Sequence, residues 1–402
     1  MKRPVVTLIL LFFIQGVIHN LGHPVTPAFV RSLEIPDYMF GFFYATMSFG
    51  LMVAAPLWGI LADKGKKNHI MFLGLIIYSI GQFGFGYANN MYLMVMFRFI
   101  SGFGVAASMT LFISHMIEVS ESNNRAKHLA WLAAGLGLGA SIGYAIGGFI
   151  STNELFVNLL KTSDLRVVFL IQGFLNIIHS INVLLFVKEK DVINKAIKKP
   201  TFIESFKNIK NINFNLLLFM ISLTFISISI TNLSKYLDVY FDDLGYSSGD
   251  IGNFVFVTGI VSLVTSIFIV PLITRLRRSL LIMIISQIVS IIAIFIVFRA
   301  SNFILYVYTL YMLYIVSRAI YQPLEQNFIA DNANDGFYSS IMGIRQSFYS
   351  IGMIIGPLIG GFLYEIAPIY VFDFANLMIG IGLILMIVIY IRLKKKNNII
   401  NS

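Results

Sequence analysis

The chain of 402 residues has no cysteine and few charged side chains. Without cysteine it can form neither a disulfide framework nor a thiolate metal site. Charged residues make up 12% of the sequence and hydrophobic residues 57%, whereas soluble domains contain about a quarter charged residues. This scarcity of charge excludes a soluble protein and predicts an integral membrane protein.

Apolar stretches of membrane-spanning length recur along the whole chain. A span needs about 20 apolar residues, and the sequence divides into twelve such stretches separated by glycine, proline, asparagine or charged residues. The first is interpreted as a retained helix that runs to about Val30, because no signal-peptide cleavage pattern follows Lys2 and Arg3. The twelve spans are predicted to begin near residues 5, 38, 69, 91, 127, 166, 213, 247, 279, 303, 338 and 370.

The 29 lysine and arginine residues collect on one side of the predicted spans. With both termini in the cytoplasm, the basic residues expected in outer segments are Arg31, Lys161, Arg166 and Arg299, and most of the others fall in cytoplasmic segments. This positive-inside distribution indicates an even number of crossings of a cytoplasmic membrane. It also accounts for the net charge of +10, so nucleic acid is not predicted as a partner.

A glycine-rich run occurs twice in the chain. Residues 139–149 return as residues 352–362 with seven of eleven positions identical. Glycines four apart lie on one face of a helix and allow close contact with a neighbour. The duplication predicts two six-helix halves, residues 1–187 and 213–402, joined by a basic cytoplasmic linker over residues 188–212, and such halves place a substrate site at mid-membrane. The repeated glycines are Gly139, Gly143 and Gly147 in the first copy and Gly352, Gly356 and Gly360 in the second.

A tight cytoplasmic turn follows the second predicted span. It reads Gly59-Ile-Leu-Ala-Asp63-Lys-Gly65-Lys66-Lys and resembles the major facilitator superfamily signature Gly-x-Leu-Ala-Asp-Arg-x-Gly-Arg-Lys. The spacing between Asp63 and Gly65 is one residue shorter than in that signature. In the family this loop abuts the start of the eleventh helix, so the resemblance implies a latch that holds one access state. The alternative is a solvated turn whose charges only set the topology.

Two further motifs carry the same resemblance. Arg98 opens Arg-x-x-x-Gly-x-Gly-x-Ala in the fourth span, which the family associates with proton coupling in the cavity; the alternative is an arginine that extends outwards to the membrane surface. The glycine run is similar to Gly-x-x-x-Gly-Pro-x-x-Gly-Gly, which marks the antiporter branch. Tyr144 replaces the motif proline in the first copy, whereas Pro357 keeps it in the second. As a whole, the chain resembles the twelve-span drug:proton antiporters of bacteria.

This resemblance implies an all-α membrane fold of twelve transmembrane helices in two pseudo-symmetric halves. It implies a monomeric secondary transporter that exports small lipophilic molecules in exchange for protons, without a cofactor. The alternatives are an uptake or facilitative carrier for a polar solute such as a sugar, and a membrane protein that does not transport. Ser141 fits Gly-x-Ser-x-Gly, but a nucleophile elbow needs a strand-to-helix turn and Ser141 lies mid-helix, so no enzyme is predicted.

Polar residues in the first and seventh spans are candidates for the substrate cavity. Gln15, His19 and His23 repeat at four-residue spacing beside Asn20, which predicts substrate contact or proton handling, with packing against neighbouring spans as the alternative. His19 and His23 also have a two-ligand metal spacing, but zinc needs a third protein ligand and none is evident. The seventh span ends with Asn232, Lys235, Tyr236 and Asp238, in which Lys235 and Asp238 are spaced to form a salt bridge or to act in coupling.

The tenth span carries the deepest acid in the sequence. Arg318, Gln322 and Glu325 follow i, i+4, i+7 spacing, and Tyr321 widens their polar face. We expect Glu325 to exchange a proton as it pairs with and leaves Arg318 or Arg345, which lies early in the eleventh span. In the first half the span-associated acid is Glu118, at the cytoplasmic end of the fourth span. The first half therefore gives weak support for a preference for cationic drugs.

Overall fold

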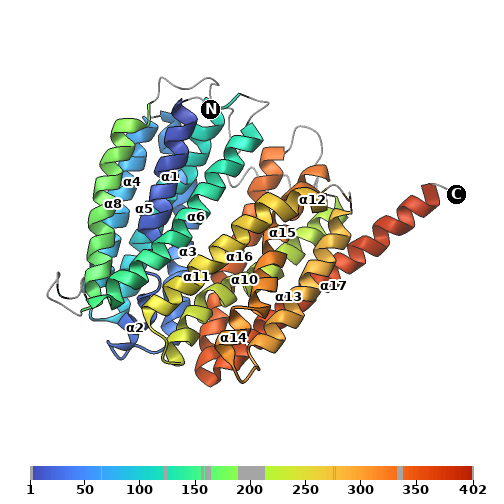
Figure 1. Ribbon diagram of the computed structural model, residues 1–402. Helices are drawn as coiled ribbons and strands as arrows, with labels where there is room; N and C mark the ends of the chain where they lie inside the picture. Colours follow the sequence, from blue (N-terminus) through green and yellow to red (C-terminus); the bar gives the residue numbers. More distant parts are fainter. Residues whose placement is uncertain are drawn as a thin grey trace. The chain divides into compact units, whose positions relative to one another are not determined.

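The computed structural model describes residues 3–64, 66–121, 125–154, 158, 164–188, 213–274, 276, 278–332 and 338–400. These residues form long helices and no strands (Figure 1). Within the described residues, twelve helical segments are long and apolar enough to cross a membrane, which confirms the predicted twelve-span, all-α membrane fold. Each begins within a few residues of its predicted start, because charged and helix-breaking residues mark the ends of the apolar stretches.

The helices before residue 188 are α1 (Arg3–Asn20), α2 (Thr26–Arg31), α3 (Tyr38–Lys64), α4 (Lys67–Tyr87), α5 (Met91–Val119), α6 (Arg125–Thr152) and α8 (Arg166–Phe186). Those after residue 212 are α10 (Phe214–Asp243), α11 (Ser248–Val264), a π-helical turn η4 (Thr265–Ile269), α12 (Val270–Thr274), α13 (Ser279–Val297), α14 (Phe303–Val307), α15 (Leu310–Asp331), α16 (Tyr338–Ile366) and α17 (Pro368–Ile400).

The first span is shorter than the sequence predicts. The expected helix to Val30 is wrong, because α1 ends at Asn20 and a turn leads into the separate helix α2. Pro24 lies in this turn and Pro27 in the first turn of α2. Proline lacks an amide hydrogen and restricts the residue before it, so it fits a break and a helix start better than a continuous helix.

The chain forms two compact units. The first unit comprises Met1–Lys198 with Asp238–Gly259, and the second comprises Lys199–Leu237 with Ile260–Ser402. The first unit thus includes the end of α10 and much of α11, which follow the predicted linker in sequence. A division by chain order at residues 188–212, which lie mostly outside the described residues, stays a prediction.

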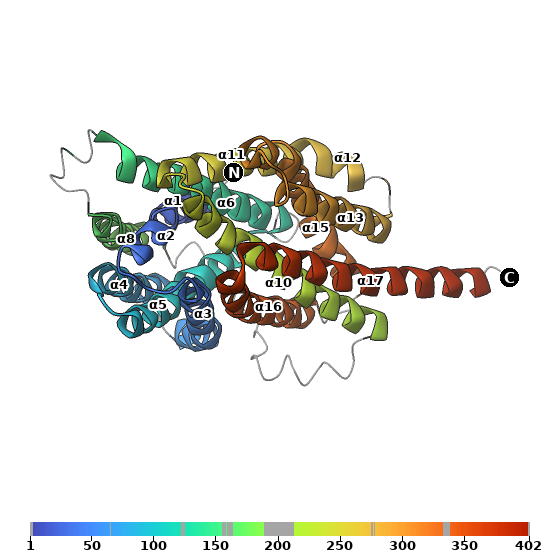
Figure 2. The same cartoon turned by 90° about the horizontal axis from the view of Figure 1, so that it is seen from below.

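In the first unit, buried aliphatic and aromatic side chains, most of them from α1, α4, α5 and α8, form an apolar cluster. Helix α5 packs against both α3 and α4, as the end-on view in Figure 2 shows. Helix α4 also packs on α8, and α1 on α6. These contacts make the first unit a bundle whose interior is closed by side chains from several spans.

The first glycine run brings two helix backbones together. A Cβ atom on Gly139, Gly143 or Gly147 of α6 would collide with a backbone carbonyl group of α1 or of the turn after it. The opposite side of α6 packs closely on α11, where Gly148 lies against the backbone of Ser248. The run therefore joins α1 and α11 to α6 inside the first unit.

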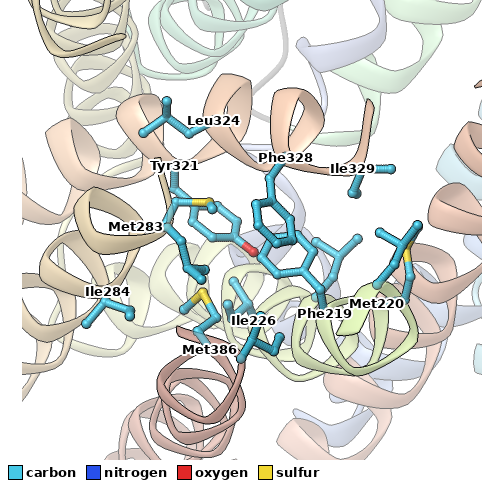
Figure 3. Close-up of a cluster of buried hydrophobic side chains, with 14 of the residues drawn as sticks. Phe219, Met220, Ile226, Met283, Ile284, Tyr321, Leu324, Phe328, Ile329 and Met386 are labelled. Carbon is cyan, nitrogen blue, oxygen red and sulfur yellow. The ribbon is translucent and has the colours of Figure 1, made fainter. Parts of the chain in front are cut away.

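The second glycine run does the same in the second unit. Gly352, Gly356 and Gly360 of α16 lie against backbone and side-chain atoms of α10. Buried side chains of α10, α13, α15 and α17 form the apolar cluster of this unit, in which Met283, Tyr321 and Phe328 lie close together (Figure 3). Both copies of the repeat therefore make close helix contacts within their own units, the first with α1 and α11 and the second with α10.

Candidate functional site

The most buried carboxylate among the described residues is Glu325 of α15, which is 1% exposed. Arg345 of α16 holds both of its oxygens, with Nε 2.8 Å from Oε1 and Nη2 2.8 Å from Oε2. The guanidinium of Arg345 also lies near the Tyr349 ring, 5.2 Å from its centroid. Of the two arginines considered from the sequence, Arg345 is the one that forms this two-pronged ion pair. The role of the pair in coupling stays a prediction.

Arg318 lies about two helical turns before Glu325 and lines a small pocket in the second unit. The pocket has a volume of about 10 Å³, close to that of one water molecule. Tyr321 shares the pocket with Arg318, whereas Gln322 is exposed on another face of α15. The predicted polar face of the tenth span is thus divided between a pocket, an ion pair and an exposed side. The pocket is lined by Ile226, Ile230, Gln287, Ser290, Tyr314, Arg318, Tyr321 and Ile379.

The candidate residues of α10 lie at different positions along the helix and make different contacts. Asn232 is fully buried beside Gly360, and neither atom of its amide has a hydrogen-bond partner among the described residues. The Tyr236 hydroxyl donates a hydrogen bond of 3.1 Å to the carbonyl of Pro357. Lys235 is half-buried. These contacts tie α10 to the second glycine run, and Asn232 is the candidate with unused polar atoms.

Asp238, which belongs to the first unit, accepts a hydrogen bond of 3.0 Å from the hydroxyl of Tyr144. The tyrosine that replaces the motif proline therefore makes a specific polar contact. Close to the same end of α10, Arg31 contacts Asp242, Asp243 and Asp37 through ion pairs of 2.8–3.2 Å. Partial burial opposes the charge of Arg31, but these three carboxylates outweigh it and raise the pKa of the guanidinium. The sequence placed Arg31 outside the membrane without revealing its partners.

The four candidates of the first span do not form one stripe. Gln15 donates a hydrogen bond of 2.7 Å to Ser108 of α5, and His19 lies 3.2 Å from the amide oxygen of Asn176. Asn20 bonds back to the carbonyl of Gly16 in its own helix. His23 lies beyond the end of α1 and stacks on Tyr144, with ring centroids 5.4 Å apart. The break after α1 explains why His23 is separated from the other three residues.

His19 joins a buried network that the sequence analysis missed. Gln172 of α8 donates to the carbonyl of His19 at 2.8 Å, and Asn176 donates to Ser79 of α4 at 2.8 Å. Both ring nitrogens of His179, one turn after Asn176, are buried without a partner among the described residues. Gln172, Asn176 and His179 repeat at i, i+4, i+7 within an apolar span, which is the signal that would have identified them.

Arg98 of α5 is buried at 7% exposure. Its guanidinium carbon lies 3.7 Å from the centroid of the Phe85 ring on α4. The outward-extending alternative is therefore wrong, because a cation–π contact inside the bundle takes the place of the membrane surface. An expected role of Arg98 in proton coupling stays a prediction.

The Gly59–Lys66 motif after α3 lies partly outside the described residues. This applies to Gly65 and to the side chain of Asp63, while Gly59 has open space around its Cα and Lys66 is exposed. The next residue, Lys67, is buried and pairs with Glu118 of α5, whose second oxygen lies 3.7 Å from Nδ1 of His115. Burial raises the pKa of Glu118, but the neighbouring His115 and the ion pair with Lys67 outweigh burial and lower that pKa.

Comparisons with known proteins place this geometry in a family. The family model described as Major Facilitator Superfamily matches residues 7–247 and 217–401. The chain is 22% identical to multidrug resistance protein 2 of Bacillus subtilis over 367 residues, covering 90% of this chain and 88% of that protein. It is 24% identical to the quinolone resistance protein NorA of Staphylococcus aureus over 392 residues, covering 93% and 94%.

Solved structures show the same fold. A D-xylose–proton symporter superposes with a TM-score of 0.74 at 12% identity, covering 96% of each chain. The nucleoside transporter NupG superposes with a TM-score of 0.70 at 15% identity, covering 96% of this chain and 99% of the transporter. At these identities the likeness concerns the fold, and the cargo has to be argued from the residues of the site.

Proposed function

Because this multi-pass chain belongs to the Major Facilitator Superfamily and is a transporter of small molecules, we propose that it exports lipophilic compounds in exchange for protons. The observation that carries this proposal is the buried pair of Glu325 and Arg345. In the proposed orientation both termini lie in the cytoplasm and the protein resides in a bacterial cytoplasmic membrane, as the positive-inside distribution favours.

The pair of Glu325 and Arg345 links proton binding to a change in contacts. Protonation of Glu325 removes the negative charge to which Arg345 donates its two hydrogen bonds. A proton that reaches Glu325 therefore favours opening of the pair, and loss of the proton favours its return. In an alternating-access cycle these two states correspond to the proton-loaded and proton-free forms of the carrier.

The direction of transport is argued from the relatives and the motif. Proteins with names that refer to multidrug and quinolone resistance match nearly the whole chain, and the glycine run resembles the antiporter motif. Export removes a toxic compound, whereas uptake of a sugar or nucleoside is suggested by structures that share the fold at low identity. The buried ion pair serves either direction, so the relatives favour export over a carrier that takes up polar solutes.

The test measures the direction and the coupling together. Inverted and right-side-out membrane vesicles containing the protein receive the lipophilic dye Hoechst 33342 and an imposed proton gradient of either sign. We expect inverted vesicles to accumulate the dye when their lumen is acidic, and a protonophore to abolish the accumulation. Accumulation in right-side-out vesicles with an acidic exterior would instead support uptake, and gradient-independent equilibration would support a facilitative carrier.

A substitution separates coupling from binding. Glu325→Gln keeps the shape of the side chain but cannot exchange a proton, so proton-driven accumulation should fall by about tenfold or more while the dye still binds. Glu365→Gln is the matched control, because Glu365 is an exposed carboxylate on α16. Unchanged proton-driven accumulation in Glu325→Gln would show that the pair is structural.

A further inference from the structure

Tyr321 is a close polar neighbour of Glu325. The two residues lie four positions apart on α15, so their side chains project from the same face of the helix. Both are almost fully buried, at 3% and 1% exposure respectively. The Tyr321 ring extends toward Phe328, which lies one turn beyond Glu325 in the same apolar cluster (Figure 3). The charges of Glu325 and Arg345 both act on the Tyr321 hydroxyl.

The Tyr321 hydroxyl makes no hydrogen bond in this arrangement. It is buried and has no partner among the described residues. Arg345 holds both oxygens of Glu325 at 2.8 Å, and the Tyr321 hydroxyl donates to neither of them. A buried hydroxyl without a partner is unfavourable. Tyr321 is therefore suited to a partner that appears only when the ion pair has opened.

A protonated Glu325 needs a kind of partner that arginine cannot supply. A carboxyl group carries an O–H donor, whereas a guanidinium group only donates and a tyrosine hydroxyl both accepts and donates. The ring of Tyr349 lies near the guanidinium of Arg345, so this second tyrosine belongs with the arginine on α16. From α10 and α13, apolar side chains enter the cluster. Among the described residues, the titratable and charged groups on the helices packed around Glu325 are Tyr314, Arg318, Tyr321, Arg345, Tyr349 and Tyr390.

We propose that Tyr321 is the hydrogen-bond partner of the protonated Glu325 carboxyl and thereby stabilises the proton-loaded form of the carrier. A proton binds one oxygen of Glu325, and the hydrogen bonds from Arg345 lose the negative charge that they contact. The new O–H group then donates to the oxygen of Tyr321. When the proton leaves, Arg345 takes both carboxylate oxygens again and the Tyr321 hydroxyl returns to the state seen here. Tyr321 is a positioning residue in this scheme, and the inference rests on the proposed proton exchange at Glu325.

An infrared titration of the full-length protein in lipid nanodiscs tests the inference without requiring transport. The C=O stretching band of the protonated Glu325 carboxyl is assigned by its loss in Glu325→Gln. We expect Tyr321→Phe to lower the titration midpoint by about half a pH unit to one pH unit, because this variant loses a hydrogen bond that only the protonated form makes. An unchanged midpoint would overturn the inference. A raised midpoint would also overturn it, since the hydroxyl would then stabilise the carboxylate.

A matched variant and a stability measurement exclude a merely structural role. Tyr311 is another tyrosine of α15 with 3% exposure, and it lies about four helical turns before Glu325. Tyr311→Phe should therefore titrate like the wild-type protein. Tyr321→Phe should keep the wild-type melting temperature, because the lost hydroxyl has no partner among the described residues. A lower melting temperature with an unchanged midpoint would show that the hydroxyl binds a structural water in the adjacent pocket, which contradicts the proposal.

Three outcomes separate this inference from the proposed function. Proton-driven export of Hoechst 33342 by the wild-type protein, with an unchanged midpoint in Tyr321→Phe, would leave the function standing and refute the role of Tyr321. A lowered midpoint in Tyr321→Phe, without proton-driven movement of the dye by the wild-type protein, would support the hydrogen bond and refute coupled export. If no carboxyl band is lost in Glu325→Gln at any pH, Glu325 does not bind a proton and both proposals fail.

Discussion

The hydroxyl of Tyr144 on α6 donates a hydrogen bond of 3.0 Å to Oδ2 of Asp238 near the end of α10. Tyr144 occupies the position at which the related motif has proline, and the second copy of the motif keeps Pro357. Proline has no side-chain donor, so this contact exists because of the replacement. The altered copy of the glycine run therefore makes an additional hydrogen bond within the first unit.

Removal of this hydrogen bond should destabilise the protein. Tyr144→Phe keeps the ring that stacks on His23 but removes the donor, and hydrogen bonds to a charged group contribute about 1.5–3 kcal/mol. We expect a lower melting temperature in detergent for Tyr144→Phe and for Asp238→Asn. The double variant should lose less than the sum of the two, because both changes remove one interaction. Additive losses would show that the contact contributes nothing.

The glycine runs provide a second prediction. Alanine at Gly143 or Gly356 would place a Cβ against backbone atoms of α1 or α10 respectively. Overpacking of this kind costs about 1–3 kcal/mol. Gly137→Ala and Gly380→Ala are matched controls, because no atom lies within 4 Å of a Cβ built at either position. In thermal unfolding, we expect the variants at Gly143 and Gly356 to melt at lower temperatures than the controls at Gly137 and Gly380. Equal melting temperatures would show that the contacts are not tight.

The sequence predicted the spans well because hydrophobicity and breakers are local properties. It also identified Glu325 and Arg345, since ionisable residues in an apolar span stand out. The partners of Tyr144, Arg31 and His19 come from distant segments, and no spacing rule connects residues 94, 211 and 157 positions apart. The predicted polar stripe of the first span does not extend to His23, because prolines end the helix before that residue. Long-range contacts and helix breaks therefore required the structure.

The pair of Lys67 and Glu118 should make stability depend on acidic pH. The folded-state pKa of Glu118 is lowered from its ordinary value, which is about 4.3 in an unfolded chain. A lowered pKa gives stabilisation that is complete above the unfolded value and is lost as the pH falls through the folded value. Glu118→Gln should therefore melt earlier than the wild-type protein at pH 7, with a difference that shrinks below about pH 4.

The cost at neutral pH comes mainly from the partner left behind. Lys67 is 7% exposed, so loss of the carboxylate leaves a buried ammonium without its counter-ion, which costs about 3 kcal/mol. Replacement of both residues, Lys67→Met with Glu118→Leu, should restore most of the stability because no charge remains buried. A double variant less stable than Glu118→Gln would contradict this account.

We expect His19 and His179, two buried histidines of the first unit, to respond differently to replacement by leucine. His19→Leu removes the partner of the Asn176 amide oxygen, and a buried acceptor without a partner costs about 1–3 kcal/mol. His179→Leu removes two ring nitrogens that have no partner among the described residues, so it should leave the melting temperature unchanged or raise it. Both histidines are almost fully buried, which makes them a matched pair in size and environment. If His179→Leu destabilises the protein as much as His19→Leu does, the ring nitrogens of His179 bind water or a ligand that contributes to folding, and the network extends beyond the hydrogen bonds described above.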